Sequence, residues 1–575
     1  MGLPDTTTTT MGTSRQLVLG LLFGLVLVWT VRSVNLYLAR RRFKQQHGCQ
    51  PVRSWFYNRD PILGLDAIYN MLQRSKAGTV LEWIHWRNRT YGPTFGTRMG
   101  MHLPSWMGGS ASGYAFSTTD PENIKAVLAT RFKDYGHGNT RTGTFGPLLG
   151  SGIFVVDGAR WHESRALLRP NFAREQVADL ESLERHFSLL LSLIPQSGDA
   201  TVNLATLFFR LTIDTSSEFL FGTSVDSLRA LKESGGDPNK TSADSAFAKA
   251  MNDAQVDILT RTRFRWLYHL TSHPHAKEAI EFIHAYVDRF VDEAVRQREA
   301  LDLEKGSSTA TTTTDGEKYV FLRELAKVTK DRKVIRDELL NILLAGRDTT
   351  ASLLSNFFFV LAKRPDVWAK LKAEVAGLEG RAPTYETLKG LKYVKYCLNE
   401  CEPTSPLHPF YKWPQMIRKY VLVAITDTWL HIHSPPHPPR RPPEQPRGHA
   451  GHGPAPRRGS RRAVPVFVPK GTVVGWSCYV LHRNRAYYGD DADEFRPERW
   501  ETLRPSWEYL PFNGGPRIFV GQQYALTEAA YVTIRLVQEF ERIESRDPGP
   551  WVESIGLTVC PRNGTKVGMY RSTSS

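Results

Sequence analysis

Apolar positions are densest near the N-terminus, where residues 17–31 run without a charge and the apolar character continues past Arg32 to residue 39. A transmembrane helix needs about 20 mostly apolar residues. We therefore expect residues 17–39 to cross a membrane behind a Thr-rich tail, residues 1–16, with Arg32 near the interface. Four cations follow this run directly: Arg40, Arg41, Arg42 and Lys44. Such cations keep their side of a span in the cytosol. A cleaved signal peptide is the alternative, because the apolar core is short.

Helical spacing of apolar positions dominates the next part of the chain. Two amphipathic runs cover residues 174–193 and 276–298. Residues 332–363 are apolar nearly all round, which predicts a long helix at the centre of the fold. Residues 303–317 are of low complexity and are expected to form a surface loop.

Short strands are expected late in the chain, at residues 464–469 and 471–480. The predicted fold class is therefore mainly α with a small β portion. The length of 575 residues allows two or three average domains, but no linker divides the chain in half. Hydrophobic residues at 41% and charged residues at 23% are ordinary for a globular protein, which excludes a disordered or disulfide-rich chain.

The cysteines do not suggest a metal site or a disulfide framework. They form no CxxC pair and have no regular spacing, which fits a reducing compartment. Cys478 falls on the second predicted strand, and Cys560 lies near the C-terminus. The five positions are Cys49, Cys397, Cys401, Cys478 and Cys560.

The net charge of +16 suggests nucleic acid or an anionic membrane as a partner until its distribution is considered. Residues 403–465 contain ten Lys or Arg and two acids, so this segment carries +8 of the total. The chain has no motif that reads a nucleic-acid groove, and we expect no nucleic-acid partner.

Within the long helix, the sequence AGRDTT at residues 345–350 interrupts an apolar element with small and polar residues. Gly and Thr lower helix propensity, and a Thr hydroxyl can bond back to the preceding turn. One interpretation is a groove beside a cofactor in which Asp348 and Thr349 relay protons. The other is a kinked core helix with a solvated charge pair.

A glycine-rich loop, FNGGPRIFVG at residues 512–521, precedes the helical run from Tyr524 to Phe540. Glycine and proline allow a tight loop that approaches a cofactor closely, just where a helix begins. Together with AGRDTT and with FRPERW at residues 495–500, this loop resembles the haem-binding loop of the cytochrome P450 family. The resemblance assigns cofactor-binding positions to Phe512, Gly515, Arg517 and Gly521.

The resemblance extends through most of the chain. Trp161 and Arg165, in WHESR, match the family's helix motif that meets a haem propionate, and Arg517 matches its second propionate arginine. A guanidinium suits a carboxylate because it donates two parallel hydrogen bonds. The sequences at residues 47–50, 86–95 and 157–180 look most like fungal membrane-bound enzymes that hydroxylate fatty acids and alkanes.

The resemblance implies a haem held by a cysteine thiolate, O₂ bound opposite the thiolate, and electrons from NADPH through a flavoprotein reductase. Asp348 and Thr349 would guide protons to the oxygen. An alkyl chain would lie in an apolar channel, chosen mainly by its shape. The enzyme would sit in the endoplasmic reticulum membrane as a single-pass protein with its catalytic domain in the cytosol.

Two positions depart from the family. Phe519 stands where the pattern FxxGxRxCxG needs the ligand cysteine. Because a phenyl ring cannot bind iron, we expect the chain to provide no metal ligand. Three residues after Glu400, the family's ExxR arginine is replaced by Pro403, which also stops a helix. Glu400 and Arg499 are expected to remain as a two-member remnant of the family's structural network.

Residues 403–465 contain fourteen prolines and resemble no helix or strand of the family. Their histidines suggest a metal-binding tract and PPHPPRRPP suggests a polyproline ligand. We favour a stretch translated in a wrong frame or from a retained intron, and a real disordered insertion is the alternative.

The sequence thus predicts one catalytic domain over residues 50–572, interrupted at 401–463, behind the membrane anchor. The expected function is a haem-dependent monooxygenase of fatty acids, alkanes or similarly hydrophobic compounds. The rival is an inactive, membrane-bound relic that at most binds a hydrophobic ligand, and Phe519 is the feature that separates the two.

Overall fold

The computed structural model describes residues 7–60, 63–98, 114–172, 179–195, 197–235, 243–271, 274–305, 319–401, 430–432 and 465–571. The chain divides into two units. One comprises Met1–Arg53 with Pro438–Pro469, and the other comprises Ser54–His437 with Lys470–Ser575.

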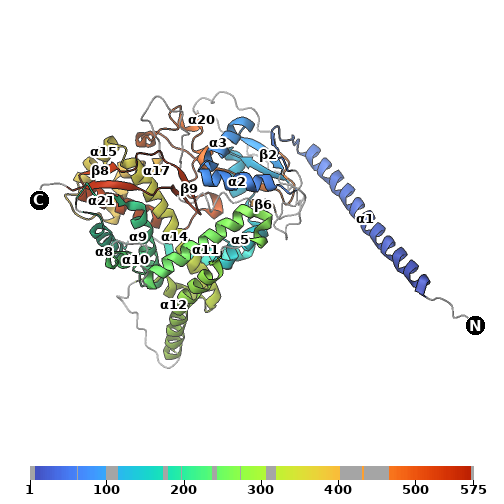
Figure 1. Cartoon of the computed structure of the whole chain (residues 1–575), viewed down its shortest axis with the longest axis horizontal. Helices are drawn as coiled ribbons and strands as arrows, with labels where there is room; N and C mark the ends of the chain where they lie inside the picture. The colour runs from blue at the N-terminus through green and yellow to red at the C-terminus, as the bar shows by residue number, and fades with distance from the viewer. Residues whose placement is uncertain are drawn as a thin grey trace, which may run out of the picture. The chain divides into compact units, whose positions relative to one another are not determined.

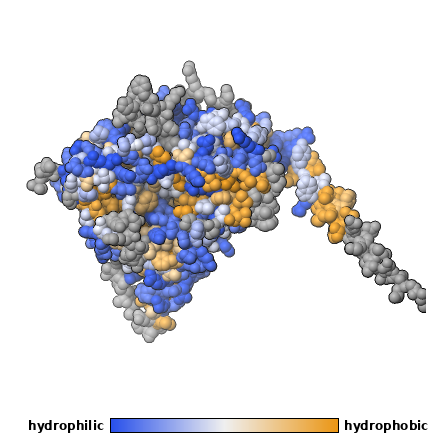
Figure 2. Space-filling view, viewed as in Figure 1, coloured by the Kyte–Doolittle hydropathy of each residue, from blue (hydrophilic) through white to orange (hydrophobic). Residues whose placement is uncertain are grey.

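The first unit contains one long helix, α1 (Thr7–Gln46), which begins within the predicted Thr-rich tail. Its part from Val18 to Gln46 is long and apolar enough to cross a membrane, and its apolar side chains are exposed (Figure 2). The helix is therefore compatible with a membrane anchor. The strand predicted at residues 464–469 is wrong where it is described, because Val466 forms an isolated bridge with Gln50 and no extended strand.

The second unit is mainly helical (Figure 1). The helices before residue 270 are α2 (Leu65–Ala77), α3 (Val80–Tyr91), α4 (Pro121–Lys125), α5 (Gly138–Leu149), α6 (Gly158–Leu168), α8 (Leu180–Ser192), α9 (Leu204–Phe221), α10 (Ser227–Glu233) and α11 (Ala243–Phe264). The later ones are α12 (Ala276–Lys305), α13 (Phe321–Val328), α14 (Arg332–Leu361), α15 (Pro365–Ala376), α16 (Tyr385–Gly390), α17 (Lys392–Glu400), α19 (Cys478–Leu481), α20 (Arg485–Tyr488) and α21 (Gln522–Glu539). Short π and 3₁₀ turns lie at Ala126–Thr130, Phe132–Asp134, Arg169–Phe172, Arg265–Leu270, Pro497–Glu501 and Gly515–Arg517.

The prediction that α14 is central is confirmed. Asp331 caps the helix by accepting from the backbone N–H groups of Lys333 and Val334. The N-terminal half of α14 contributes to a hydrophobic cluster with α5, α11, α12 and α13. Its C-terminal half contributes to a second cluster with α8, α9, α15 and α21. A helix buried on all sides in this way holds the surrounding elements in place.

Three small sheets complete the second unit. The largest has the order β1-β2-β3-β7-β6-β4, a second has the order β5-β11-β8, and β9 pairs with β10. The strands are β1 (Trp55–Phe56), β2 (Thr94–Arg98), β3 (Tyr114–Thr118), β4 (Tyr135–Gly136), β5 (Val202–Asn203), β6 (Leu430–Ile432), β7 (Val473–Gly475), β8 (Arg542–Ser545), β9 (Glu553–Ile555), β10 (Val559–Pro561) and β11 (Lys566–Tyr570).

The structure corrects several predicted boundaries. The strand expected at residues 471–480 is limited to β7, and Cys478 begins the helix α19 instead of lying on a strand. The loop expected from residue 303 begins later, because α12 continues to Lys305, and the rest of that loop lies outside the described residues. Strand β6 falls within the segment at 403–465, where no strand was expected, and pairs with β4 and β7. The remainder of the segment is outside the described residues up to Pro465.

Candidate functional site

The glycine-rich loop turns sharply before α21. Asn513 and Gly515 have φ angles of 66° and 61°, and a Cβ on Gly515 would lie 2.1 Å from the carbonyl oxygen of Leu128. Glycine is therefore required at 515 by both its conformation and its neighbour. The loop is closed by a hydrogen bond from the Phe519 backbone N–H to the Phe512 carbonyl, 3.0 Å long.

Phe519 occupies the centre of this loop. Its side chain is 7% exposed, and its ring lies parallel to that of Phe512, with centroids 6.4 Å apart and an interplanar angle of 9°. Offset parallel rings of this kind stabilise one another beyond the area they bury. Phe519 is thus an ordered part of the core and presents carbon atoms where the family pattern requires a sulfur.

A cavity lined in part by Phe519 brings together the predicted propionate-binding residues. Trp161 and Arg165 reach it from α6, and Arg517 reaches it from the loop. The structure adds Arg141 and His137, at the start of α5, which the sequence reasoning missed. Burial lowers the pKa of all three arginines, that of Arg141 to about 9. In the sequence, Arg141 and His137 were marked only by their position shortly before the Trp161 motif. The tertiary structure brings them to the cavity.

Asp157 anchors this cationic cluster. It accepts hydrogen bonds from the backbone N–H groups of His137 and Gly138 and from the Arg517 guanidinium. Arg165 is held differently, because its guanidinium donates a hydrogen bond to the Ile518 carbonyl over 2.9 Å. Protein groups therefore hold both arginines at the cavity.

Polar side chains of α14 hold the turn that supplies Ile153 and Phe154 to the same cavity. Glu338 Oε2 accepts from the Ile153 N–H at 3.1 Å, and Asn341 Oδ1 accepts from the Phe154 N–H at 3.0 Å. Asp337 accepts from the Ser151 N–H at 2.8 Å. Burial raises the pKa of Glu338 to about 7. These polar residues in the central helix are explained by the unsatisfied N–H groups of the turn.

The AGRDTT motif lies in the buried middle of α14. Thr349 donates its hydroxyl to the Ala345 carbonyl, 2.7 Å away, as expected for a Thr that bonds to the preceding turn. Asp348 lies 3.2 Å from Arg347, and both are 4% exposed, so the charge pair is buried rather than solvated. Burial raises the pKa of Asp348, and Arg347 opposes this effect. A buried carboxyl group of raised pKa suits proton transfer.

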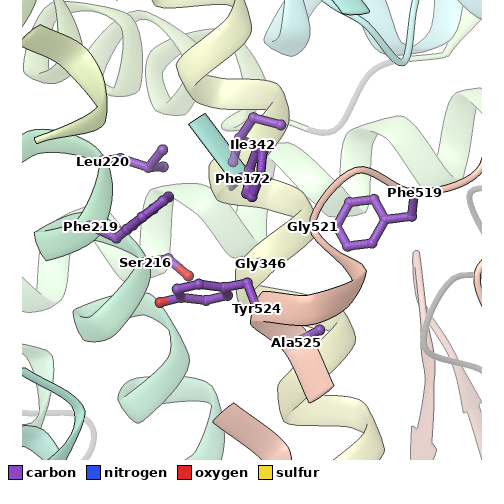
Figure 3. A pocket seen from close by; sticks show the side chains of 10 residues that line it. All are labelled: Phe172, Ser216, Phe219, Leu220, Ile342, Gly346, Phe519, Gly521, Tyr524 and Ala525. Carbon is purple, nitrogen blue, oxygen red and sulfur yellow. The ribbon is translucent and has the colours of Figure 1, made fainter. Parts of the chain in front are cut away.

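Phe519 also lines a second, apolar cavity (Figure 3). Its walls come from α9, α14, α21, the glycine-rich loop and the turn at Arg169–Phe172, and they include Gly346 and Gly521. A Cβ on Gly346 would lie 2.7 Å from the Ser216 hydroxyl, so this glycine allows α9 and α14 to approach. The remaining lining residues are Phe172, Phe219, Leu220, Ile342, Tyr524 and Ala525.

The Glu400–Arg499 pair forms and is larger than two members. Arg499 Nε donates to Glu400 Oε1 at 2.8 Å, and Trp500 Nε1 donates to Glu400 Oε2 at 2.8 Å. The Arg499 amino groups donate to Asp491 Oδ1 and to the carbonyls of Tyr488, Asp491 and Glu494. All the N–H groups of Arg499 therefore have acceptors. Helix α17 ends at Glu400, and Pro403 lies outside the described residues.

Glu528 of α21 is a buried acid that the sequence reasoning did not single out. Its Oε1 accepts a hydrogen bond from the Thr215 hydroxyl of α9 at 2.5 Å. Burial raises the pKa of Glu528 to about 7, and the hydroxyls of Thr215 and Thr350 oppose this effect. This hydrogen bond links α9 and α21, two of the helices that line the apolar cavity beside Phe519.

These features define a class of protein: a mainly helical enzyme fold in which a buried helix with an acid–alcohol pair faces a glycine-rich loop and a cluster of arginines. The cytochrome P450 family profile matches residues 61–402 and 464–567. The chain belongs to the cytochrome P450 family. By family it is a monooxygenase, and hence an oxidoreductase.

Individual fungal proteins are similar over nearly the whole chain. The cytochrome P450 monooxygenase himC of Aspergillus japonicus is 44% identical over 544 residues, which is 93% of this chain and 87% of the relative. The cytochrome P450 monooxygenase fsdH of Fusarium heterosporum is 40% identical, over 95% of this chain and 87% of its own. Cytochrome P450 52A12 of Debaryomyces hansenii is 40% identical, over 91% and 92%.

The family implies haem, and the residues present fit one part of that group but not the other. Arg517 Nε is buried without a hydrogen-bond partner in the described part of the chain, beside a cavity that carries two more guanidinium groups, so an anionic ligand edge fits. The iron does not fit, because Phe519 offers no donor atom. None of the five cysteines lines either cavity, and no group of three or more His, Cys, Asp or Glu side chains suited to a metal occurs among the described residues.

Proposed function

We propose that the chain holds a fatty acid, an alkane or a similarly hydrophobic compound in a P450-type pocket, and that hydroxylation of this compound requires a cysteine in place of Phe519. The observation that carries the proposal is the state of the loop. Phe519, at the position of the family's ligand cysteine, is buried, stacks on Phe512 and offers no donor atom.

Several residues have proposed roles in this site. Trp161, Arg165 and Arg517 would hold the cofactor's carboxylates, and Asp348 and Thr349 would relay protons. When bound through a thiolate, haem supplies the oxygen-activating chemistry of the family, with electrons from NADPH through a flavoprotein reductase. We place the protein in the endoplasmic reticulum membrane, anchored by residues 17–39, with the catalytic domain over residues 50–572 in the cytosol.

The segment at residues 401–463 is proposed to be foreign to the catalytic domain. It coincides closely with the interval, 403–463, between the two stretches that match the family profile. Sequencing the transcript through codons 397–465 and 519 tests this directly. An ExxR helix after residue 396 and a cysteine codon at 519 would show that the enzyme is intact in the cell.

The protein itself is tested by comparing the parent chain with its Phe519→Cys variant, both reconstituted with haem and a reductase. The reduced carbon-monoxide difference spectrum should show a thiolate-type Soret band for the variant and none for the parent. Hydroxylated dodecanoic acid or hexadecane should form with the variant alone. A thiolate-type band from the parent contradicts the proposal. A folded variant, with the helical circular dichroism of the parent but no such band, contradicts it as well.

A further inference from the structure

The two cavities that meet at Phe519 differ sharply in chemistry. Phe519 lines both of them. The first cavity is lined by Arg141, Arg165 and Arg517 and by no carboxylate among its lining residues. The apolar cavity is lined mostly by aromatic and aliphatic side chains, with the Ser216 hydroxyl, and by no charged residue (Figure 3). A ligand that spans both must be apolar in its body and acidic along one edge.

We propose that this site binds a planar aromatic dicarboxylate of the porphyrin class through its acid edge and its faces, and that it does not distinguish a metal-free porphyrin from its iron complex. The inference rests on the proposed function in one respect, namely that the pocket of the family is retained. It goes further by assigning the site a ligand class that needs no metal ligand from the protein.

The acid edge is the best-defined part of the recognition. Arg517 has 8% of its side-chain surface exposed, and its Nε lacks a hydrogen-bond partner in the described part of the chain. The Arg141 guanidinium is also buried, at 5% exposure, and is repelled by Arg517. Asp157 lies opposite Arg517 but leaves the lining with a net positive charge. A ligand with two acid groups would balance that charge, whereas a fatty acid supplies a single one.

The body of the ligand is defined by aromatic surface. The Phe519 ring stacks on Phe512. Phe172, Phe219 and Tyr524 provide further aromatic surface in the lining of the apolar cavity. Flat aromatic ligands gain offset-stacking as well as hydrophobic contact from such walls. An alkyl chain would gain hydrophobic contact alone.

The metal contributes nothing to recognition in this arrangement. Phe519 replaces the one side chain that would distinguish an iron complex by direct bonding, and no cysteine lines either cavity. His137 lies in the cationic cavity, beside the arginines that would hold the acid edge. Iron and two protons at the centre of the macrocycle should therefore meet the same apolar surroundings.

The test uses the full chain in detergent micelles, with metal-free protoporphyrin IX, its ferric complex and dodecanoic acid as probes. Porphyrin binding is followed by quenching of tryptophan fluorescence, and dodecanoic acid by its competition with the metal-free porphyrin. We expect the two porphyrins to bind with dissociation constants within about threefold of each other. Arg517→Gln should weaken both by about tenfold or more, since charged hydrogen bonds contribute about 1.5–3 kcal/mol. Arg169→Gln, at an exposed arginine nearby, is the matched control and should change neither.

Each other result overturns the inference. A ferric complex that binds more than tenfold tighter than the metal-free porphyrin shows a protein ligand, and loss of that preference in His137→Ala would identify it. Equal binding that Arg517→Gln does not weaken shows adsorption without an acid-edge site, and Arg165→Gln provides a second check if the first variant unfolds. Tighter binding of dodecanoic acid shows a fatty-acid site instead. The Phe519→Cys variant separates this inference from the proposed function, because it should gain affinity for the ferric complex alone.

Discussion

Glu528 provides a test of how burial controls a charge in this fold. Burial raises its pKa from 4.5 to about 7. The folded chain therefore keeps a proton that the unfolded chain loses between these pH values, and stability falls as the pH rises through that window. The stabilising contribution is complete below about pH 4.5 and is lost by about pH 7. With about 1.4 kcal/mol per pH unit, the 2.5-unit shift corresponds to about 3 kcal/mol.

The Glu528→Gln variant removes this titration and keeps a carbonyl oxygen to accept from Thr215. Its free energy of unfolding, relative to the parent chain, should rise by about 2–3 kcal/mol between pH 5 and pH 8. Urea titrations of both chains in detergent micelles, followed by far-ultraviolet circular dichroism, measure that difference. Glu181→Gln, at a side chain that is 90% exposed, is the control and should show little change with pH. A difference that is constant across this pH range would refute the assignment of a neutral Glu528 to the folded state.

Two further predictions concern the surroundings of Phe519. Arg499→Lys should lower the free energy of unfolding by about 3–5 kcal/mol in the same urea titration, because lysine cannot make the five hydrogen bonds of the Arg499 guanidinium and each buried acceptor left without a donor costs about 1–3 kcal/mol. Arg496→Lys, at a side chain that is 53% exposed, is the control, and a loss below about 1 kcal/mol for Arg499→Lys would contradict the network. Gly515→Ala should cost more than about 2 kcal/mol, because the positive φ costs about 1–3 kcal/mol and the new Cβ would meet the Leu128 carbonyl. Gly390→Ala, with open space around the glycine, should be near neutral, and an equally mild Gly515→Ala would contradict the loop geometry.

The sequence was sufficient to predict an element where its local pattern is compatible with a single structure. A run of apolar residues at all angles of a helix can be stable only when it is surrounded, so the central position of α14 was predictable from residues 332–363. The apolar run before Arg40 has too few polar groups for a soluble helix surface, and α1 exposes it. The family motifs also identified the chain as a cytochrome P450, because their order and chemistry are specific. The absence of a thiol at Phe519 needed no structure at all.

The tertiary structure decided what depends on meetings between distant residues. Arg141 had no motif to mark it, and the fold brings it to the cavity of Arg517, more than 300 residues later. Glu528 looked like an ordinary helix glutamate until Thr215 and its burial gave it a pKa near neutrality. Residues 471–480 had the composition of a strand, yet their C-terminal part is helical at Cys478, since strand pairing is settled by neighbours rather than by local preference. The charge of a side chain, its burial and the pairing of a strand depend on residues that are distant in the sequence. The sequence alone therefore identified the residues of the loop, and the structure determined what surrounds Phe519.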